Sequence, residues 1–370
     1  MRTVLSQDPK SVTSSNTRSV SRPRVRPMLD EGVRDQLHRP FRDLRISVTD
    51  KCNFRCTYCM PREVFDAQYQ FLKHSQLLSF EEITRVAKIA LQLGVNKLRL
   101  TGGEPLLRRN IEELVAMLAA LRKPDGNAPE IALTTNGTLL AAKAQALKDA
   151  GLNRVTVSLD ALDSARFAHL SDSKVAVEQV LNGIDRAAAV GLQPVKVNMV
   201  VRKGLNDDQI LPMVEHFRHG PHILRFIEYM DVGNSNGWNM QEVVTGKQIH
   251  DLIHACYPLE PLKAHYTGEV AGRYRFMDGA GEIGLITSVS QPFCGDCSRM
   301  RLSPEGKLFL CLFGSKGVDL RSVLRSDAAD DEVAGFMAGT WRKRTDQYSE
   351  LRSAGVAPES EKVEMSYIGG

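Results

Sequence analysis

The stretch Cys52-Asn-Phe-Arg-Cys56-Thr-Tyr-Cys59 holds three thiols in a C-x3-C-x2-C run, directly after a predicted strand over residues 44–48. Three thiolates can hold three corners of an iron-sulfur cubane and leave the fourth iron open. Catalytic metal sites keep an open position of this kind, whereas a closed electron-transfer cluster normally takes four cysteines. The short run alone is also compatible with a structural zinc site or with a chance spacing.

On both sides of this run the chain carries the pattern of an α/β fold. Short apolar or β-branched segments alternate with helical patterns, which is typical of βα units in a parallel sheet. Strands are expected over residues 44–48, 97–101, 131–135, 154–159, 194–201 and 223–229, and helices are expected to begin near Ser79, Asn110, Leu140, Ser173 and Asn206. Six repeats fall short of the eight of a complete TIM barrel. We therefore predict a partial open (β/α)6 TIM-type barrel.

The pattern changes after residue 240 to short glycine-rich pieces, a second cysteine group and a helical region over residues 318–344. This change predicts three parts: a disordered N-terminal extension over residues 1–40, a barrel over 41–240, and a smaller C-terminal α+β layer over 241–370. We expect that layer to pack across the barrel opening, where the active-site loops of such barrels lie.

Composition excludes several classes of protein. The 370 residues are 42% hydrophobic and carry a net charge of only +4, so neither a membrane span of roughly 20 apolar residues nor a broad nucleic-acid surface is indicated. Seven cysteines, six of them in two tight groups, suggest reduced, metal-bound thiols in a cytoplasmic setting. The serine- and arginine-rich start could instead be a transit peptide, which would place the protein in an organelle matrix.

The second cysteine group is Cys294-Gly-Asp-Cys297 with Cys311 further along. A zinc knuckle usually needs a fourth ligand. Cys256 could supply it, but this residue falls in an apolar helical pattern over residues 249–257 and is expected to be a buried thiol. Two triads that both lack a fourth cysteine suggest one site that generates a radical and one that holds a substrate.

Several cations occupy unusual positions. Arg299 and Arg301 alternate on a predicted strand and so point to the same side. Arg45 and Arg99 lie within predicted interior strands, where charge is costly unless it is paired. A polyanion inside the barrel would compensate these four arginines together with Lys196.

The run Gly102-Gly103-Glu104-Pro105, one βα unit after the first triad, resembles the S-adenosylmethionine (SAM) binding element of the radical SAM superfamily. Tyr58, the aromatic residue before Cys59, also fits that superfamily's signature. In such enzymes SAM chelates the open iron of a [4Fe-4S] cluster and is cleaved to a 5'-deoxyadenosyl radical. Segments 52–61, 97–105, 133–137, 157–161, 226–233 and 294–303, with the terminal Gly369-Gly370, resemble the GTP 3',8-cyclase family of molybdenum cofactor biosynthesis.

The resemblance implies a site for each ligand. Cys52, Cys56 and Cys59 would hold the SAM-binding cluster, and Cys294, Cys297 and Cys311 a second [4Fe-4S] cluster that meets the guanine of GTP. The SAM contacts would be Tyr58, Gly103, Ser158 and Met230. The GTP contacts would be Arg45, Arg99, Thr134 or its neighbour Thr135, Lys196, Arg299, Met300 and Arg301. The tail with Gly369 and Gly370 would reach into the active site.

The resemblance also implies the reaction and its partners. The radical would remove the ribose 3' hydrogen of GTP, and the sugar radical would close onto C8 of guanine. A flavodoxin- or ferredoxin-type reductase would supply single electrons, and a cyclic pyranopterin monophosphate synthase would use the product. The resemblance allows a homodimer. The alternatives are another two-cluster radical SAM enzyme, such as a peptide-modifying one, and a non-catalytic zinc-stabilised module.

Overall fold

Six parallel strands form the centre of the fold, in the order in which they occur in the chain. The computed structural model describes residues 32–370, except residue 267 and residues 357–360. Each predicted strand is confirmed to within one residue at either end. The strands are β1 (Asp43–Ser47), β2 (Lys97–Thr101), β3 (Glu130–Thr135), β4 (Arg154–Ser158), β5 (Val195–Val201) and β6 (His222–Glu228).

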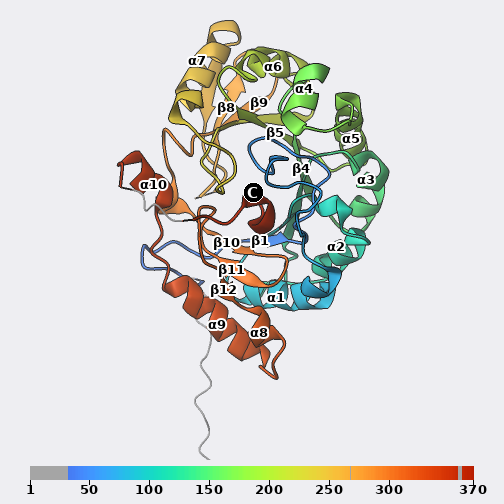
Figure 1. Cartoon of the computed structure of the whole chain (residues 1–370), viewed down its shortest axis with the longest axis vertical. Coiled ribbons are helices and arrows are strands. Elements are labelled where there is room, and N and C mark those ends of the chain that lie inside the picture. The colour runs from blue at the N-terminus through green and yellow to red at the C-terminus, as the bar shows by residue number, and fades with distance from the viewer. Residues whose placement is uncertain (1–31, 267, 357–360) are drawn as a thin grey trace, which may run out of the picture.

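Helices follow these strands and lie on the outside of the curved sheet (Figure 1). They are α1 (Phe80–Gln92), α2 (Ile111–Ala119), α3 (Leu140–Asp149), α4 (Ser164–Ser171), α5 (Val177–Ala189), α6 (Ile210–Phe217) and α7 (Gly246–Cys256). The capping box before α1 is present, because Glu82 N donates to Ser79 Oγ (3.1 Å) and Ser79 N donates to the Glu82 carboxylate (2.7 Å). The prediction that a helix begins near Ser173 is wrong. Helix α4 begins after Asp163, which caps it, and α5 begins only at Val177.

Strands from the C-terminal region extend both edges of the six-stranded core. On one edge β10 (Arg299–Leu302) pairs in parallel with β1 and is followed by β11 (Lys307–Phe309) and β12 (Val318–Asp319). On the other edge β9 (Glu282–Ile286) pairs in parallel with β6 and is followed by β8 (Gly272–Phe276) and β7 (Leu259–Leu262). The expected separate layer is thus partly a continuation of the sheet, which satisfies backbone groups that β1 and β6 would otherwise leave unpaired.

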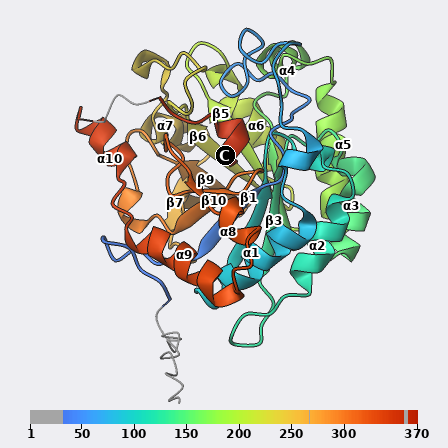
Figure 2. The same cartoon turned by 60° about the horizontal axis from the view of Figure 1, so that its bottom comes forward.

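The chain ends inside this structure. After α8 (Arg321–Leu324), α9 (Asp330–Arg342) and α10 (Tyr348–Ser353), the short helix α11 (Met365–Ile368) brings the C-terminus within the ring of strands (Figures 1 and 2). Gly370 lines the cavity there.

The predicted N-terminal extension is too long. Residues 1–31 lie outside the described residues, but residues 33–40 pack against the fold. Val33 N donates to Leu93 O (3.2 Å), and Trp341 Nε1 donates to Arg39 O (3.0 Å). Phe41 stacks on Trp341 with ring centroids 5.0 Å apart. The segment is ordered because it buries apolar rings and an Asp35–Arg39 ion pair, which composition alone did not reveal.

The two faces of the sheet differ in character. Side chains that point outward against the helices, such as Ile46, Leu98 and Leu133, are fully buried. Successive strand residues point to opposite faces, so the inward face carries the polar residues between them. No helix in the described part of the chain is both long and apolar enough to cross a membrane.

Candidate active site

A cavity of about 340 Å³ lies on the inner side of the curved sheet. All six cysteines of the two triads line it: Cys52, Cys56, Cys59, Cys294, Cys297 and Cys311. The two groups are more than 230 residues apart in the chain (294 − 59 = 235). The fold therefore brings both predicted triads to one cavity.

The first triad lies on the loop that leaves β1. Cys59 N donates to Cys56 O (3.0 Å), and Arg55 Nη1 donates to Cys52 O (2.9 Å), so backbone and side chain both fix the loop. Burial raises the pKa of Cys52 to about 11 and the pKa values of Cys56 and Cys59 well above the ordinary range. Free thiols there are neutral, and metal binding must displace their protons.

The cysteines of the two triads are free thiols. Among the described residues, no three His, Cys, Asp or Glu side chains converge in the way that a single metal ion needs. A structural zinc ion requires four ligands at one point, whereas in a cubane each cysteine binds its own iron.

The residues expected to contact SAM lie beside the first triad. Tyr58, Gly103, Ser158 and Met230 all line the cavity. The backbone at Gly103 packs closely on the cysteine loop, since Gly103 N donates to Thr49 O (2.8 Å) and a Cβ at Gly103 would clash with the Lys51 carbonyl. Glycine is required here because of this close approach.

Two buried carboxylates support the same end of the cavity. Glu104 accepts hydrogen bonds from Thr135 Oγ1 (2.8 Å) and Asn136 N (2.7 Å), and burial nevertheless raises its pKa to about 7. Asp160 accepts from Tyr58 Oη (2.7 Å) and Val200 N (2.8 Å), and burial raises its pKa to about 6. Asp160 thus fixes the ring of Tyr58, a positioning role that the sequence analysis missed.

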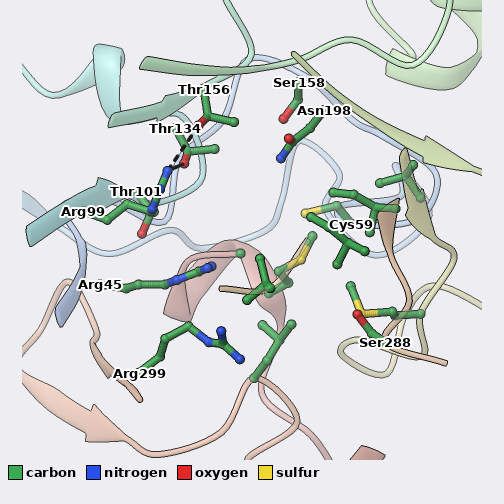
Figure 3. Close-up of a pocket in the computed structure, with 18 of the residues that line it drawn as sticks. Arg45, Cys59, Arg99, Thr101, Thr134, Thr156, Ser158, Asn198, Ser288 and Arg299 are labelled. Carbon is green, nitrogen blue, oxygen red and sulfur yellow. Dashed lines mark hydrogen bonds between the residues drawn. The ribbon is translucent and has the colours of Figure 1, made fainter. Parts of the chain in front are cut away.

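The strand register gathers the cations on the opposite side. Arg45 of β1 pairs with Arg301 of β10 on one side and with Arg99 of β2 on the other. Residues paired across strands point to the same face, and like charges placed directly opposite one another are destabilising. Figure 3 shows Arg45, Arg99 and Arg299 on one side of the cavity, with Cys59 and Ser288 on the other.

These cations differ in how far the protein already satisfies them. The side chains of Arg45 and Lys196 make no hydrogen bond or ion pair to any other described residue, although the backbone of each residue pairs within the sheet. Among the described residues, the Arg99 guanidinium donates only to hydroxyls, those of Thr134 (3.0 Å) and Thr156 (3.3 Å). Burial, followed by the charges of Arg301 and Arg99, lowers the pKa of Arg45 well below its usual range. The charge left uncompensated is what a polyanionic ligand would neutralise.

Thr134 and Thr135 face different groups. Thr134 Oγ1 lies against Arg99, whereas Thr135 Oγ1 donates to Glu104. Thr134 is therefore the better placed of the two for a ligand bound by the cations.

The Met300 side chain departs from the prediction. It is fully buried and does not line the cavity, because it points to the opposite face from its neighbours Arg299 and Arg301. Its side chain therefore cannot touch a ligand in the cavity.

Two further strand cations that the sequence did not single out line the cavity. Arg225 lies in β6 and donates to Asn198 Oδ1 (2.9 Å), and Lys97 begins β2 and pairs with Glu130 (3.1 Å). Burial lowers the pKa of Arg225 to about 9. An arginine within a predicted interior strand is the same signal that singled out Arg45 and Arg99, so it could have identified Arg225.

Binding of a polyanion to the cations of the cavity is expected to be coupled to proton uptake by Lys196. Burial, and next the charge of Arg225, lower the pKa of Lys196 to about 7, so a bound anion would raise it and favour the ammonium form. Affinity should be highest below this pKa and fall as pH rises through it. Calorimetry in buffers of different ionisation enthalpy measures the uptake. Lys196→Met should reduce it, whereas Lys203→Met, an exposed control, should not; equal uptake in both variants would contradict the role of Lys196.

The second triad sits in a more cationic setting than the first. Burial disfavours the Cys297 thiolate, but Arg299 and Arg344 outweigh this effect and lower the pKa of that thiol to about 6. Burial raises the pKa of Cys311 to about 12. Cys256, expected to be buried, is instead exposed on α7, and it does not line the cavity. It therefore cannot act as a fourth ligand.

The C-terminal tail enters the cavity and is tied down before it does so. Glu364 accepts hydrogen bonds from Asn234 N (3.0 Å) and Ser235 Oγ (3.0 Å) in the loop after β6. Further along the tail, Arg301 donates to Gly369 O, and Gly370 lines the cavity. The predicted entry of the Gly-Gly tail is therefore present in the structure.

Glu364→Ala is expected to release this tail. A hydrogen-bonded carboxylate contributes about 1.5–3 kcal/mol, so kcat for a reaction that needs the tail in place should fall at least about tenfold. Steady-state turnover measures the loss. Glu361→Ala removes the same charge from an exposed tail position and should retain activity. Equal kcat in the two variants would show that the Glu364 contacts do not position the tail.

Comparison with known proteins identifies the family. The model described as "Radical SAM superfamily" matches residues 46–217, and "Molybdenum Cofactor Synthesis C" matches residues 222–350. A GTP 3',8-cyclase of Acidothermus cellulolyticus is 51% identical, covering 92% of this chain and 100% of that relative. The chain belongs to the GTP 3',8-cyclase family. A second GTP 3',8-cyclase, from Xanthomonas axonopodis pv. citri, is 50% identical over 91% of this chain and 99% of its own length.

The membership expected of the chain in the GTP 3',8-cyclase family is thus confirmed. Streptococcus suis SuiB bound to S-adenosylmethionine is similar in fold, with a TM-score of 0.60 and 15% identity over 86% of this chain and 71% of that one. At this identity the likeness shows the fold alone. The coarse prediction, a radical SAM α/β fold, is also confirmed, and its sheet is mixed.

Proposed function

We propose that this chain is a GTP 3',8-cyclase that converts GTP to (8S)-3',8-cyclo-7,8-dihydroguanosine 5'-triphosphate, the first step of molybdenum cofactor biosynthesis. The observation that carries the proposal is the single cavity that both cysteine triads and the uncompensated cations line. Close relatives that bear this name and align over nearly the whole chain support it.

The two triads would hold two [4Fe-4S] clusters. Their thiols are free and line one cavity, and each triad offers three ligands, as a cubane with one open iron requires. The first cluster, when reduced and bound to SAM, supplies a 5'-deoxyadenosyl radical. Tyr58, Gly103, Ser158 and Met230 would hold SAM beside the first triad, and Asp160 would keep the Tyr58 ring in place.

The cations on the opposite side would bind the triphosphate and so fix the orientation of GTP. Arg45, Arg99, Arg299 and Arg301 suit the forked binding of phosphate oxygens, and Lys196 and Thr134 lie beside them. The register that places Arg301, Arg45 and Arg99 in one row leaves positive charge in the free protein that a bound anion would compensate. Held there, the ribose 3' hydrogen would face the SAM end while guanine lies toward the second triad.

The remaining partners follow from the chemistry proposed. A one-electron donor of flavodoxin or ferredoxin type would reduce the first cluster in a cytoplasmic setting. A cyclic pyranopterin monophosphate synthase would consume the product.

Anaerobic reconstitution tests the function. The protein is loaded with iron and sulfide, reduced, and given SAM with GTP. Deoxyadenosine and a cyclised nucleotide should then form together, with iron in both sites. Tetrahedral zinc in the cysteine sites, with no SAM cleavage, would overturn the proposal.

A further inference from the structure

Two arginines hold the loop that carries Cys294 and Cys297. Arg344 follows α9, and its side chain is only 1% exposed. It donates to Cys297 O (2.6 Å) and also to Cys297 Sγ (3.2 Å). It therefore contacts both the backbone and the sulfur of one cysteine.

Arg39 holds the other end of the same loop. Its side chain, also 1% exposed, donates to Cys294 O (2.9 Å) and to Asp346 O (2.8 Å). Its Nη2 is buried without a hydrogen-bond partner in the described part of the chain, so one donor remains free at the cysteine loop.

Neighbouring groups keep both guanidinium groups in place. Asp346 accepts from Arg344 (3.0 Å), and Asp35 pairs with Arg39 (2.5 Å). Arg344 also lies over the ring of Trp341, 4.7 Å from its centroid. The arginines are thus pre-organised before any ligand arrives, and neither belongs to the row of β-strand cations that faces the polyanion site.

The two triads differ in the hydrogen bonds that their sulfur atoms accept. Cys297 Sγ accepts hydrogen bonds from two guanidinium groups, Arg344 (3.2 Å) and Arg299 (3.2 Å). In the first triad, Cys52 Sγ accepts from the neutral donors Phe54 N (3.4 Å) and Asn136 Nδ2 (3.9 Å). Hydrogen bonds and positive charge at cluster sulfurs favour the reduced, more negative state.

We propose that Arg344, held by Asp346 and assisted by Arg39, is a positioning residue for the second cluster that raises its reduction potential through its hydrogen bond to Cys297. The inference rests on the two-cluster function proposed above. It assigns the segment around Arg39, which carried no expected role, to the second cluster site.

The test isolates the second cluster. A background variant with Cys52, Cys56 and Cys59 replaced by serine is reconstituted anaerobically, and the one-electron midpoint is measured by titration followed by electron paramagnetic resonance. Arg344→Met should lower the ratio of reduced to oxidised cluster about tenfold at a fixed potential, a shift of about 59 mV. Arg344→Lys keeps the charge but loses the guanidinium that donates to Cys297 O and Cys297 Sγ at once, so it should shift the midpoint less and in the same direction. It also serves as the test if the methionine variant does not fold.

Arg85→Met is the matched control, because Arg85 pairs with Asp330 and bonds to carbonyls near α9 but touches no cysteine. The midpoint potential of the second cluster in Arg85→Met should equal that of the triple-serine background variant. An unchanged midpoint in both Arg344 variants, or an equal shift in Arg85→Met, would overturn the inference and leave the second cluster standing. Failure of the triple-serine background to bind iron and sulfide would overturn the second cluster itself, and with it the inference.

Discussion

Replacing Cys294 with serine is expected to abolish formation of the cyclised nucleotide while leaving SAM cleavage measurable. Cys294 belongs to the second triad, and no hydrogen bond in the described residues joins it to the loop that carries Cys52, Cys56 and Cys59. The first cluster should therefore form, and bound iron should fall to about half. Deoxyadenosine would then be produced without being coupled to product, because the guanine end of the substrate has lost its ligand.

Iron and sulfide content, deoxyadenosine and cyclised nucleotide measure this result together. Cys256→Ser is the matched control, since Cys256 is an exposed thiol that does not line the cavity, and it should behave like the unmodified protein. Normal GTP turnover by Cys294→Ser would show that the second triad is structural.

Arg45→Met is expected to weaken GTP binding and to stabilise the free protein. Arg45 lines the cavity between Arg99 and Arg301, and its side chain has no polar partner among the described residues. Loss of one charge-assisted contact to phosphate costs about 1.5–3 kcal/mol, which is roughly 10- to 100-fold in Kd. Removal of an uncompensated charge from the row formed by Arg301, Arg45 and Arg99 should raise the free energy of unfolding by about 1 kcal/mol.

Because GTP affinity should fall while stability rises, the experiment separates a role in binding from a structural role. Binding is measured by anaerobic calorimetry with GTP and separately with SAM, and stability by denaturant unfolding without ligand. SAM affinity should change little. Arg42→Met, an exposed neighbour on the same segment, should change neither quantity. Lower stability of Arg45→Met together with unchanged GTP affinity would contradict an anion-binding role and indicate a structural one.

The sequence predicted the centre of the fold well because local signals define it. Each of the six strands is an apolar run bounded by turns, and all were placed within one residue. The start of α5 was misplaced because Ser173 resembles a cap, whereas the chain first forms α4 from Asp163. Pairing of β9 and β10 with opposite edges of the sheet depends on contacts between distant segments, which periodicity does not encode.

The candidate site was predictable to a similar extent. Its prediction also failed where the site depends on contacts between distant segments. Cysteine spacing and charges within strands identified both triads and most of the cation row. Burial of Met300 follows from strand alternation and could have been foreseen. The contacts of Arg39 and Arg344 could not have been, because these residues reach the second triad from segments about 300 positions apart in the chain (344 − 39 = 305).

The most direct test of the proposed function follows a single hydrogen atom. GTP deuterated at the ribose 3' carbon is supplied with SAM to the reduced, reconstituted protein, and the deoxyadenosine is examined by mass spectrometry. If one cavity holds SAM at the first triad and GTP across from it, each cyclised nucleotide should be accompanied by one deoxyadenosine that carries one deuterium. Deoxyadenosine without deuterium, formed at the same rate with or without GTP, would contradict this arrangement.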